Sequence, residues 1–353
     1  MKWMKRTMHK GPLVREIRLS RGMTQKDFAS LLGVPQPFLS EIERQKKPVP
    51  DLLMARLKYK FSIPDVVLAA ETSPYRVGDL NFRTNKTSVA VQEAVRVTFS
   101  WMEQAVRDLL GPTPFADLSL DGFEDRAHPL PWEVIEDAAR TARRTLRIAE
   151  NGPVTNVTRA LERVGVPVVS LANPLVDFSA VDGVSSPYSG DRPVIATTEK
   201  ETGDRVRFTR AHELGHIVLH QHLRPGVERI REDEANLFAG AFLFPAEDAF
   251  RELSPGLTPA GYAQVKARYG VSISALVRRA RELGIIDQKR YRSLMIQISS
   301  RGWRSHEPVR VPVEKILLVP SIDLGLDQPI PTSDRKGEEG LGSEVIDLFS
   351  RAE

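Results

Sequence analysis

The sequence predicts an α+β protein that is mostly helical and divided into more than one domain. Its 353 residues exceed the length of one typical domain, and 41% of them are hydrophobic, which is ample for a buried core. Apolar residues at helical spacing dominate the chain, and only short segments in its middle have the composition of β-strands. We expect an N-terminal five-helix unit, a helical connector and a domain with a sheet of three or four strands.

Charge is distributed unevenly along the chain. Residues 1–64 hold 14 Lys and Arg against 5 Asp and Glu, a net charge of +9, whereas residues 65–353 hold 36 against 41, a net charge of −5. A basic block on a mildly acidic body predicts a polyanionic partner for the block alone. The absence of cysteine excludes disulfide frameworks, cysteine-ligated metal sites and a cysteine nucleophile.

No segment of the sequence has the character of a membrane span or a secretory signal. The longest apolar run, Leu237–Phe244, has eight residues, whereas a spanning helix needs about 20. The positively charged start of the chain is followed by no apolar stretch. We therefore expect a soluble cytoplasmic protein without a membrane partner.

The basic block contains two predicted helices about a tight turn, within a unit that extends over residues 11–70. Thr24 can cap the first of these helices, Gly33 can end it in the left-handed conformation, and Val34 can fill the joint before the second. This spacing is that of a helix-turn-helix, whose second helix enters the major groove of DNA. The alternative is a helical bundle with a solvated basic face.

Several side chains of this motif are candidates for contacts with double-stranded DNA. The second helix would present outward groups to the base edges, the first turn of the preceding helix can hold a phosphate, and basic residues beyond the second helix would flank the backbone. The candidates are Gln36, Ser40 and Glu41 for the bases, Gln25 for a phosphate, and Arg44, Lys46 and Lys47 for the backbone.

The motif MTQKDFASLLGV followed by LSEIERQKK resembles the XRE (Cro/CI-type) helix-turn-helix family. The resemblance implies a compact five-helix domain. Because such domains read palindromic sites as dimers, we expect a homodimer on DNA. Pro37 and Phe38 stand where members of the family often have polar base-reading residues. Phe38 is therefore a candidate for apolar contact with thymine methyl groups.

The segment from His212 to His216, HELGH, has the spacing of a zinc site. On a helix, residues four apart share a face, so both imidazoles can bind one cation, and Glu213 can accept a proton from a water at that cation. Zn²⁺ with three protein ligands lowers the pKa of such a water towards about 7, which suits peptide hydrolysis. The alternative is two surface histidines on an amphipathic helix, which is predicted from about Thr209 to His220.

A third ligand is expected from the apolar helix that follows. Glu232 and Asn236 lie four residues apart at one edge of its apolar stripe, so Glu232 can ligate the metal while Asn236 supports a ligand by a hydrogen bond. Glu234 is the rival ligand, although it lies on a different face. His220, four residues beyond His216, either supports the site from outside the ligand set or is simply the polar end of its helix.

The segments RVRFTRAHELGHIVLH and EDEANLFAGAFLFP are similar to the ImmA/IrrE family of metallopeptidases. The similarity covers roughly residues 132–250 and implies a gluzincin-like zinc site with a small sheet. It implies that His212, His216 and Glu232 bind zinc and that Glu213 is the catalytic base. It also implies regulated cleavage of a specific partner, often a DNA-bound repressor, and pairing with an XRE domain is common in this family.

Strands and domain boundaries complete the predictions. Strands are expected at Val166–Leu171, Leu175–Val181 and Pro193–Thr197, and a further one at Val206–Phe208 would place Arg205 and Arg207 on an edge strand. The expected domains are the helix-turn-helix unit over residues 11–70, a helical connector and linker over 71–131, the metallopeptidase domain with a helical extension over 132–310, and a tail over 311–353.

The sequence leaves more than one class of function open. The leading hypothesis is a DNA-binding transcriptional regulator that is also a zinc-dependent endopeptidase acting on a partner protein such as a repressor. One alternative is a regulator whose zinc fold senses a ligand without proteolysis. The other is a component of a toxin–antitoxin or phage-immunity module that binds and processes a neighbouring protein.

Overall fold

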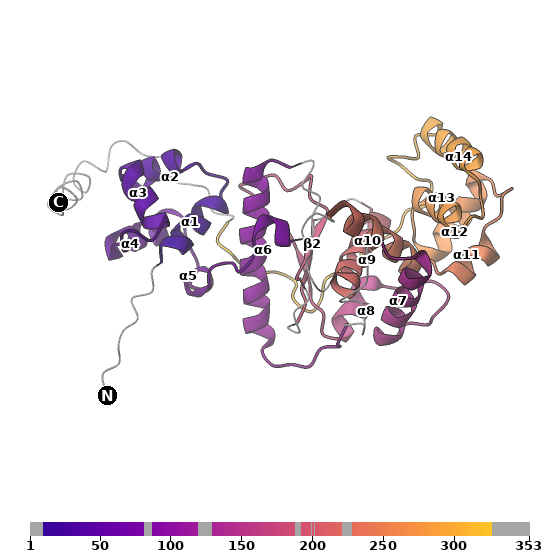
Figure 1. Ribbon diagram of the computed structural model, residues 1–353, viewed down its shortest axis with the longest axis horizontal. Coiled ribbons are helices and arrows are strands. Elements are labelled where there is room, and N and C mark those ends of the chain that lie inside the picture. Colours follow the sequence, from indigo (N-terminus) through magenta and orange to yellow (C-terminus); the bar gives the residue numbers. More distant parts are fainter. Residues whose placement is uncertain are drawn as a thin grey trace.

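The computed structural model describes residues 10–80, 87–118, 129–187, 192–198, 200, 202–220 and 228–326. Within these residues the chain forms 14 α-helices, one short 3-10 helix and three β-strands. The elements succeed one another along the long axis, from the N-terminal helices through the sheet to the C-terminal helices (Figure 1). The prediction of a mostly helical α+β protein with a small sheet is confirmed.

Five helices form the N-terminal unit, as predicted. They are α1 (Gly11–Leu19), α2 (Gln25–Leu32), α3 (Gln36–Glu43), α4 (Asp51–Lys60) and α5 (Asp65–Ala69). The side chain of Thr24 accepts a hydrogen bond from the backbone N–H of Asp27 and so caps α2, and Gly33 ends that helix with a left-handed φ of 66°. Val34 is buried at the joint between α2 and α3. The predicted turn chemistry of the helix-turn-helix is therefore confirmed.

A three-stranded mixed sheet lies in the middle of the molecule. Its strands are β1 (Val168–Ser170), β2 (Gly183–Ser185) and β3 (Ile195–Thr197). Their order is β1-β3-β2, and the central β3 pairs with β1 in parallel and with β2 in antiparallel orientation. Val168 pairs with Ile195, and Val169 with Ala196. Because side chains alternate along a strand, each of these pairs faces a different side of the sheet.

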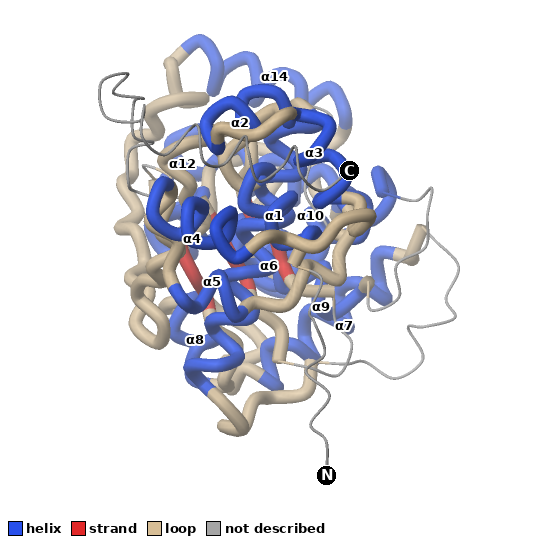
Figure 2. Tube along the Cα trace, turned by 90° about the vertical axis from the view of Figure 1, so that its left-hand side faces the viewer, coloured by secondary structure: helices blue, strands red, loops and turns tan. Residues whose placement is uncertain are grey.

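The two faces of the sheet belong to two different hydrophobic cores. Val169 and Ala196 lie in a core with the N-terminal unit and α6 (Val89–Leu110), whereas Val168 and Ile195 lie in a core with the later helices. The short 3-10 helix η1 (Val77–Asp79) precedes α6. α6 stands between the N-terminal unit and the sheet (Figure 1), and Figure 2 shows the strands behind it. The helix of the predicted connector thus joins the N-terminal unit to the sheet through buried packing.

Eight helices make up most of the rest of the described chain. They are α7 (Trp132–Thr145), α8 (Val157–Arg163), α9 (Gly203–Leu219), α10 (Glu228–Leu243), α11 (Ala246–Glu252), α12 (Pro259–Tyr269), α13 (Ile273–Glu282) and α14 (Gln288–Ser300). α7, α8 and α10 all contact α9, while α11 to α14 gather at the end of the molecule opposite the N-terminal unit (Figure 1). Among the described helices, none is both long and apolar enough to cross a membrane.

The strand predicted at Leu175–Val181 is wrong. The next segment, which forms β2, pairs with β3 in its place. The apolar side chains that suggested a strand, Val176, Phe178 and Val181, are instead buried in the core that the sheet shares with the N-terminal unit. Their hydrophobicity therefore reflects burial between two parts of the chain, which a short apolar run does not distinguish from strand pairing.

The further strand predicted at Val206–Phe208 is also wrong, because these residues lie within α9. This helix begins earlier than predicted, and all of its residues except Arg205 and Phe208 are buried. The sheet, α7, α8 and α10 enclose it. The polar residues of this helix are buried with the apolar ones, so the exposed polar face that an amphipathic surface helix would have is absent from it.

One buried carboxylate anchors the segment that follows the helices. Glu314 lies with one oxygen 3.0 Å from Nη1 of Arg207 and the other 3.9 Å from Nη1 of Arg210, and both arginines belong to α9. The same carboxylate accepts hydrogen bonds from the backbone N–H groups of Val157 and Thr158 at the start of α8. Burial lowers the pKa of both guanidinium groups, and the charge of Glu314 opposes that shift.

From this anchor the chain continues to the N-terminal unit. The backbone N–H groups of Leu317 and Leu318 donate to Glu162 of α8. Further on, Leu324 and Leu326 are buried in the core of the N-terminal unit. The described part of the predicted tail is therefore a packed strap between α9 and the N-terminal unit, and residues 327–353 lie outside the described residues.

Replacing Glu314 with alanine is expected to lower the free energy of unfolding by about 3–5 kcal/mol, because Arg207 and Arg210 would stay buried without their carboxylate. The measurement is urea unfolding of the full chain. Asp65→Ala is the matched control, since it removes an ion pair with Lys58 whose side chains are 86% and 55% exposed. Such exposed pairs contribute little to stability. Equal losses in the two variants would contradict the anchoring role of Glu314.

Candidate metal centre

The close packing of α9 on α10 brings the predicted metal ligands together. A β-carbon at Gly215, in the middle of α9, would lie 3.0 Å from a ring carbon of Phe238 on α10. Glycine therefore allows an approach of the two helices that a larger residue would hinder. This approach sets Glu232 of α10 opposite His212 and His216 of α9.

The ligating atoms of His212, His216 and Glu232 converge on one point. The Nε2 atoms of the two histidines are 3.1 Å apart, and oxygens of Glu232 lie 3.5 Å from Nε2 of His212 and 3.2 Å from Nε2 of His216. Donors at zinc–ligand distances of about 2.0–2.1 Å in a tetrahedral site would be about 3.3 Å apart. This donor set therefore fits Zn²⁺. In the described part of the chain, it is the one such group that could hold a metal ion.

Burial and hydrogen bonding keep these side chains in the forms that bind a metal. Burial lowers the pKa of His216 to about 3, so its imidazole is neutral. Burial by itself would raise the pKa of Glu232, but the hydrogen bonds of His212 and His216 outweigh it and hold that pKa below its ordinary value. A neutral imidazole and an ionised carboxylate are the states that ligate.

The structure separates the two candidates for the third ligand. Glu232 lies against His212 and His216, whereas Oε2 of Glu234 lies 3.0 Å from Nε2 of His220. Glu234 and His220 are both buried. This placement favours Glu232 as the ligand and directs Glu234 away from the point where the three donors converge.

Two further side chains contact the histidines on their other ring nitrogens. Oδ1 of Asn236 lies 3.1 Å from Nδ1 of His212, and Nδ1 of His220 lies 2.9 Å from Nδ1 of His216. Because both contacts engage Nδ1, the Nε2 atom of each histidine remains directed at the metal position. Contacts of this kind fix the tautomer and orientation of a ligating imidazole.

Glu213 faces the sheet, where it contacts β2. Its Oε2 accepts a hydrogen bond of 2.8 Å from the hydroxyl of Ser185 on β2. A β-carbon at Gly183 of the same strand would lie 2.9 Å from Oε1 of Glu213 and would crowd this carboxylate. Burial raises the pKa of Glu213 well above its ordinary value; the hydrogen bond from Ser185 opposes the shift, and the negative charge of Glu232 adds to it.

Sequence reasoning missed Ser185, Gly183 and the actual partner of Glu234. Ser185 and Gly183 lie outside both motifs, and only the pairing of β2 with β3 brings them against Glu213. The sequence did indicate that Glu234 is buried. This residue precedes Ala235 and stands four residues before Phe238, on the apolar side of its helix. An acidic residue at such a position predicts a buried partner.

The side chains predicted to contact DNA all lie at or near the surface of the N-terminal unit. None of them is buried. The exposed ones are Gln36, Arg44, Lys46 and Lys47, and the half-buried ones are Gln25, Phe38, Ser40 and Glu41.

Several of these side chains also contact one another or the interior. Gln25 donates a hydrogen bond of 2.7 Å to Glu43 and accepts one of 3.0 Å from Gln36, so the first turns of α2 and α3 are linked through their amides. Lys47 forms an ion pair of 3.1 Å with Glu41. These contacts order the side chains along the face where a DNA duplex is predicted to lie.

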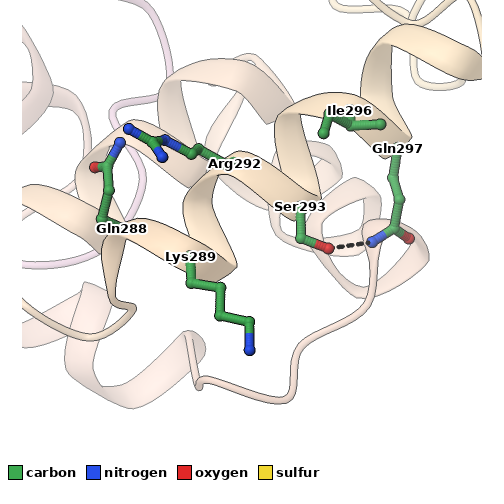
Figure 3. Close-up of a pocket in the computed structure, with 6 residues that line it drawn as sticks. All are labelled: Gln288, Lys289, Arg292, Ser293, Ile296 and Gln297. Atoms are coloured by element: carbon green, nitrogen blue, oxygen red, sulfur yellow. Dashed lines mark hydrogen bonds between the residues drawn. The ribbon is translucent and has the colours of Figure 1, made fainter.

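A hollow on the surface lies apart from both predicted sites. It is on α14, where Ser293 and Gln297 are joined by a hydrogen bond of 3.3 Å (Figure 3). Its lining residues are Gln288, Lys289, Arg292, Ser293, Ile296 and Gln297. None of them belongs to the metal group or to the predicted DNA contacts.

Two segments of the chain match known families. Residues 161–281 match a peptidase family described as the IrrE N-terminal-like domain, and residues 14–57 match a family described as helix-turn-helix. The chain combines a helix-turn-helix unit with an IrrE-like domain. The match to the IrrE-like domain includes α9 and α10, and the match to the helix-turn-helix runs from α1 to α4. Both resemblances seen in the sequence are confirmed.

A regulator from Cereibacter sphaeroides is similar to part of this chain. It is named propionyl-CoA carboxylase regulator and is 30% identical over 147 residues. The aligned region covers 38% of this chain and 32% of that protein, so the similarity spans about a third of the relative's length. Its name describes a regulator, which agrees with the helix-turn-helix unit found here.

The metal-stripped chain is expected to bind one Zn²⁺ per molecule, and both Glu232→Ala and Asn236→Ala are expected to weaken that binding. Removal of an outer partner such as Asn236 costs about 10–100-fold in affinity, and removal of the ligand Glu232 should cost more. Calorimetric titration measures each affinity. Asp233→Ala is the matched control, because this carboxylate is exposed on the same helix. Affinity that is unchanged in Glu232→Ala would contradict the assignment.

Proposed function

We propose that this chain is a DNA-binding transcriptional regulator whose IrrE-like domain is a zinc-dependent endopeptidase that cleaves a specific partner protein, such as a repressor. The observation that carries the proposal is the convergence of His212, His216 and Glu232 beside Glu213. Three protein donors with a neighbouring carboxylate are the arrangement of a catalytic rather than a structural zinc site.

In the proposed reaction, His212, His216 and Glu232 would hold the metal. Zinc, when bound, would supply a Lewis acid that polarises the peptide carbonyl and promotes attack by water. Glu213 would accept the proton of the attacking water and deliver it to the leaving amine. The hydrogen bond from Ser185 keeps the carboxylate of Glu213 in place.

The edge of the sheet supports a peptide substrate in this proposal. β2 is an edge strand of the sheet, and its Ser185 contacts Glu213. A peptide that pairs with a sheet edge is held by main-chain hydrogen bonds. An extended segment of the partner along β2 would therefore lie next to Glu213.

The helix-turn-helix unit would give the peptidase its place on DNA. In the proposal α3 enters the major groove, with Gln36, Ser40 and Glu41 towards the bases and Arg44 and Lys46 towards the backbone. A homodimer would place two such helices on a palindromic site, which a footprint of two half-sites would reveal.

The packing of the sheet favours a second candidate, a regulator that senses a ligand without proteolysis. One face of the sheet carries Val169 and Ala196 in the core of the helix-turn-helix unit, and the other face lies against α9. The DNA-binding unit and the helix that carries the two histidines therefore pack on opposite faces of one sheet. Under this second candidate, DNA binding would respond to a small ligand while no partner is cleaved.

Glu213→Gln is expected to slow proteolysis by about 10²–10⁴-fold, because the amide lacks the proton acceptor, and to leave zinc bound, because all three donors remain. The measurement is the appearance of new N-termini in a proteome-derived peptide library incubated with the zinc-loaded chain. Asp233→Asn is the matched control. Equal cleavage by the wild type and Glu213→Gln would contradict the role of Glu213. Absence of cleavage by the wild type, with ligand-dependent DNA binding, would support the second candidate.

Arg44→Ala and Lys46→Ala are each expected to weaken binding to a random-sequence DNA duplex. For each phosphate that the variant no longer neutralises, the slope of log affinity against log salt should fall by about 0.9. Fluorescence anisotropy over a range of salt concentrations measures the slope. Arg140→Ala is the control, because this arginine, whose side chain is 43% exposed, lies on α7, outside the helix-turn-helix unit. Slopes that match the wild type in both variants would contradict the predicted backbone contacts.

A further inference from the structure

A line of buried polar contacts runs from the metal group to the start of α7. Nδ1 of His216 lies 2.9 Å from Nδ1 of His220, and Nε2 of His220 lies 3.0 Å from Oε2 of Glu234. The backbone N–H of Leu130 donates to Oε1 of Glu234 over 2.6 Å. The side chains of His220 and Glu234 are 0% and 2% exposed. Both ring nitrogens of His220 and both oxygens of Glu234 are therefore engaged.

We propose that Glu234 and His220 are positioning residues that hold His216 in the tautomer and orientation it needs to bind zinc. The inference rests on the proposed zinc site and extends it, because it gives a role to a carboxylate that is not a ligand. A metal-ligating histidine commonly donates its second N–H to a carboxylate directly. Here one imidazole, that of His220, stands between the carboxylate and the ligand.

The donors and acceptors along this line allow one arrangement of protons when His216 ligates a metal. The N–H of Leu130 can only donate, and an ionised Glu234 accepts at both oxygens, so His220 has its proton on Nε2. Nδ1 of the neutral His220 then accepts the Nδ1–H of His216. This leaves the lone pair of His216 on Nε2, the atom that faces Glu232 and His212.

The position of Glu234 supports a role beyond packing. It precedes Ala235 and lies on the side of α10 that also carries Phe238, and both of those residues are fully buried. A carboxylate there loses its hydration, which is costly unless hydrogen bonds replace the water. An apolar residue at this position would bury surface without that cost. The contacts to His220 and Leu130 help to compensate the buried carboxylate.

The two histidine ligands are thus held by different means. His212 is held by Oδ1 of Asn236, four residues beyond Glu232 on the same helix. His216 lies deeper, with its side chain 1% exposed against 11% for His212. Its outer nitrogen therefore has no access to water and depends on the contact with His220.

Glu234→Gln tests the inference because glutamine has the same shape but one oxygen and one NH₂ group. The amide can accept from Leu130 or from His220, but not from both. When the NH₂ group of the glutamine faces His220, it donates to Nε2 of His220, and His220 carries its own proton on Nδ1. His216 then carries its proton on Nε2, where it blocks the metal. We expect zinc affinity to fall by about 10–100-fold. Asp233→Asn, the same change at the preceding exposed residue, should leave the affinity unchanged.

A second measurement needs no variant. ¹⁵N NMR of the zinc-loaded wild type reports which ring nitrogens carry protons, and we expect Nε2–H on His220 and Nδ1–H on His216. Zinc at Nε2 of His216 leaves the proton of His216 on Nδ1 in any case, so the tautomer of His220 is the informative readout. Observation of Nδ1–H on His220, or unchanged zinc affinity in Glu234→Gln, would overturn the inference.

These measurements separate the inference from the proposed peptidase activity, because neither needs a protein substrate. A chain that binds zinc with the expected tautomers but cleaves nothing would contradict the peptidase and support the positioning role. A chain that cleaves a partner while Glu234→Gln binds zinc normally would support the peptidase and overturn the positioning role.

Discussion

The enclosure of α9 on every side is the constraint on which the rest of the structure depends. One side of the helix lies close to α10 at Gly215, and another lies close to β2 at Gly183, where a β-carbon would crowd the side chains opposite. Consecutive residues of a helix point about 100° apart. As a result His212 faces α10 and the ligand Glu232 while its neighbour Glu213 faces the sheet. A ligand and a candidate base thus come from adjacent positions without competing for the same space.

Buried polar contacts fix α9 along its length. Near its start, Arg207 and Arg210 meet Glu314, and beyond its end, His220 meets Glu234. Each contact satisfies a group whose burial would otherwise be costly. Donor atoms of a metal site must be held within about 0.5 Å of the productive geometry. Pinning the helix at both ends supplies that rigidity, and Glu314 begins the strap that continues to the helix-turn-helix unit.

Local signals predicted most helices of this fold, while burial between distant segments misled the assignment of strands. Thr24 and Gly33 mark the ends of α2 by short-range chemistry, and both were recognised. Phe178 and Val206 have strand-like surroundings in the sequence, yet one fills a core between two parts of the chain and the other lies inside α9. Hydrophobic runs report burial, and burial alone does not specify the backbone conformation.

The sequence by itself determined the helix-turn-helix and the pair His212 and His216, because both depend on spacing within one or two turns of helix. It also favoured Glu232 over Glu234 as the third ligand, because Glu232 shares an edge of the apolar stripe with Asn236. Only the tertiary structure set Glu232 against the histidines, Glu234 against His220, and Ser185 against Glu213. The physical reason is that these contacts depend on how α9 packs against α10 and β2, and interhelical approach and strand register are set by the assembled core rather than by any local pattern.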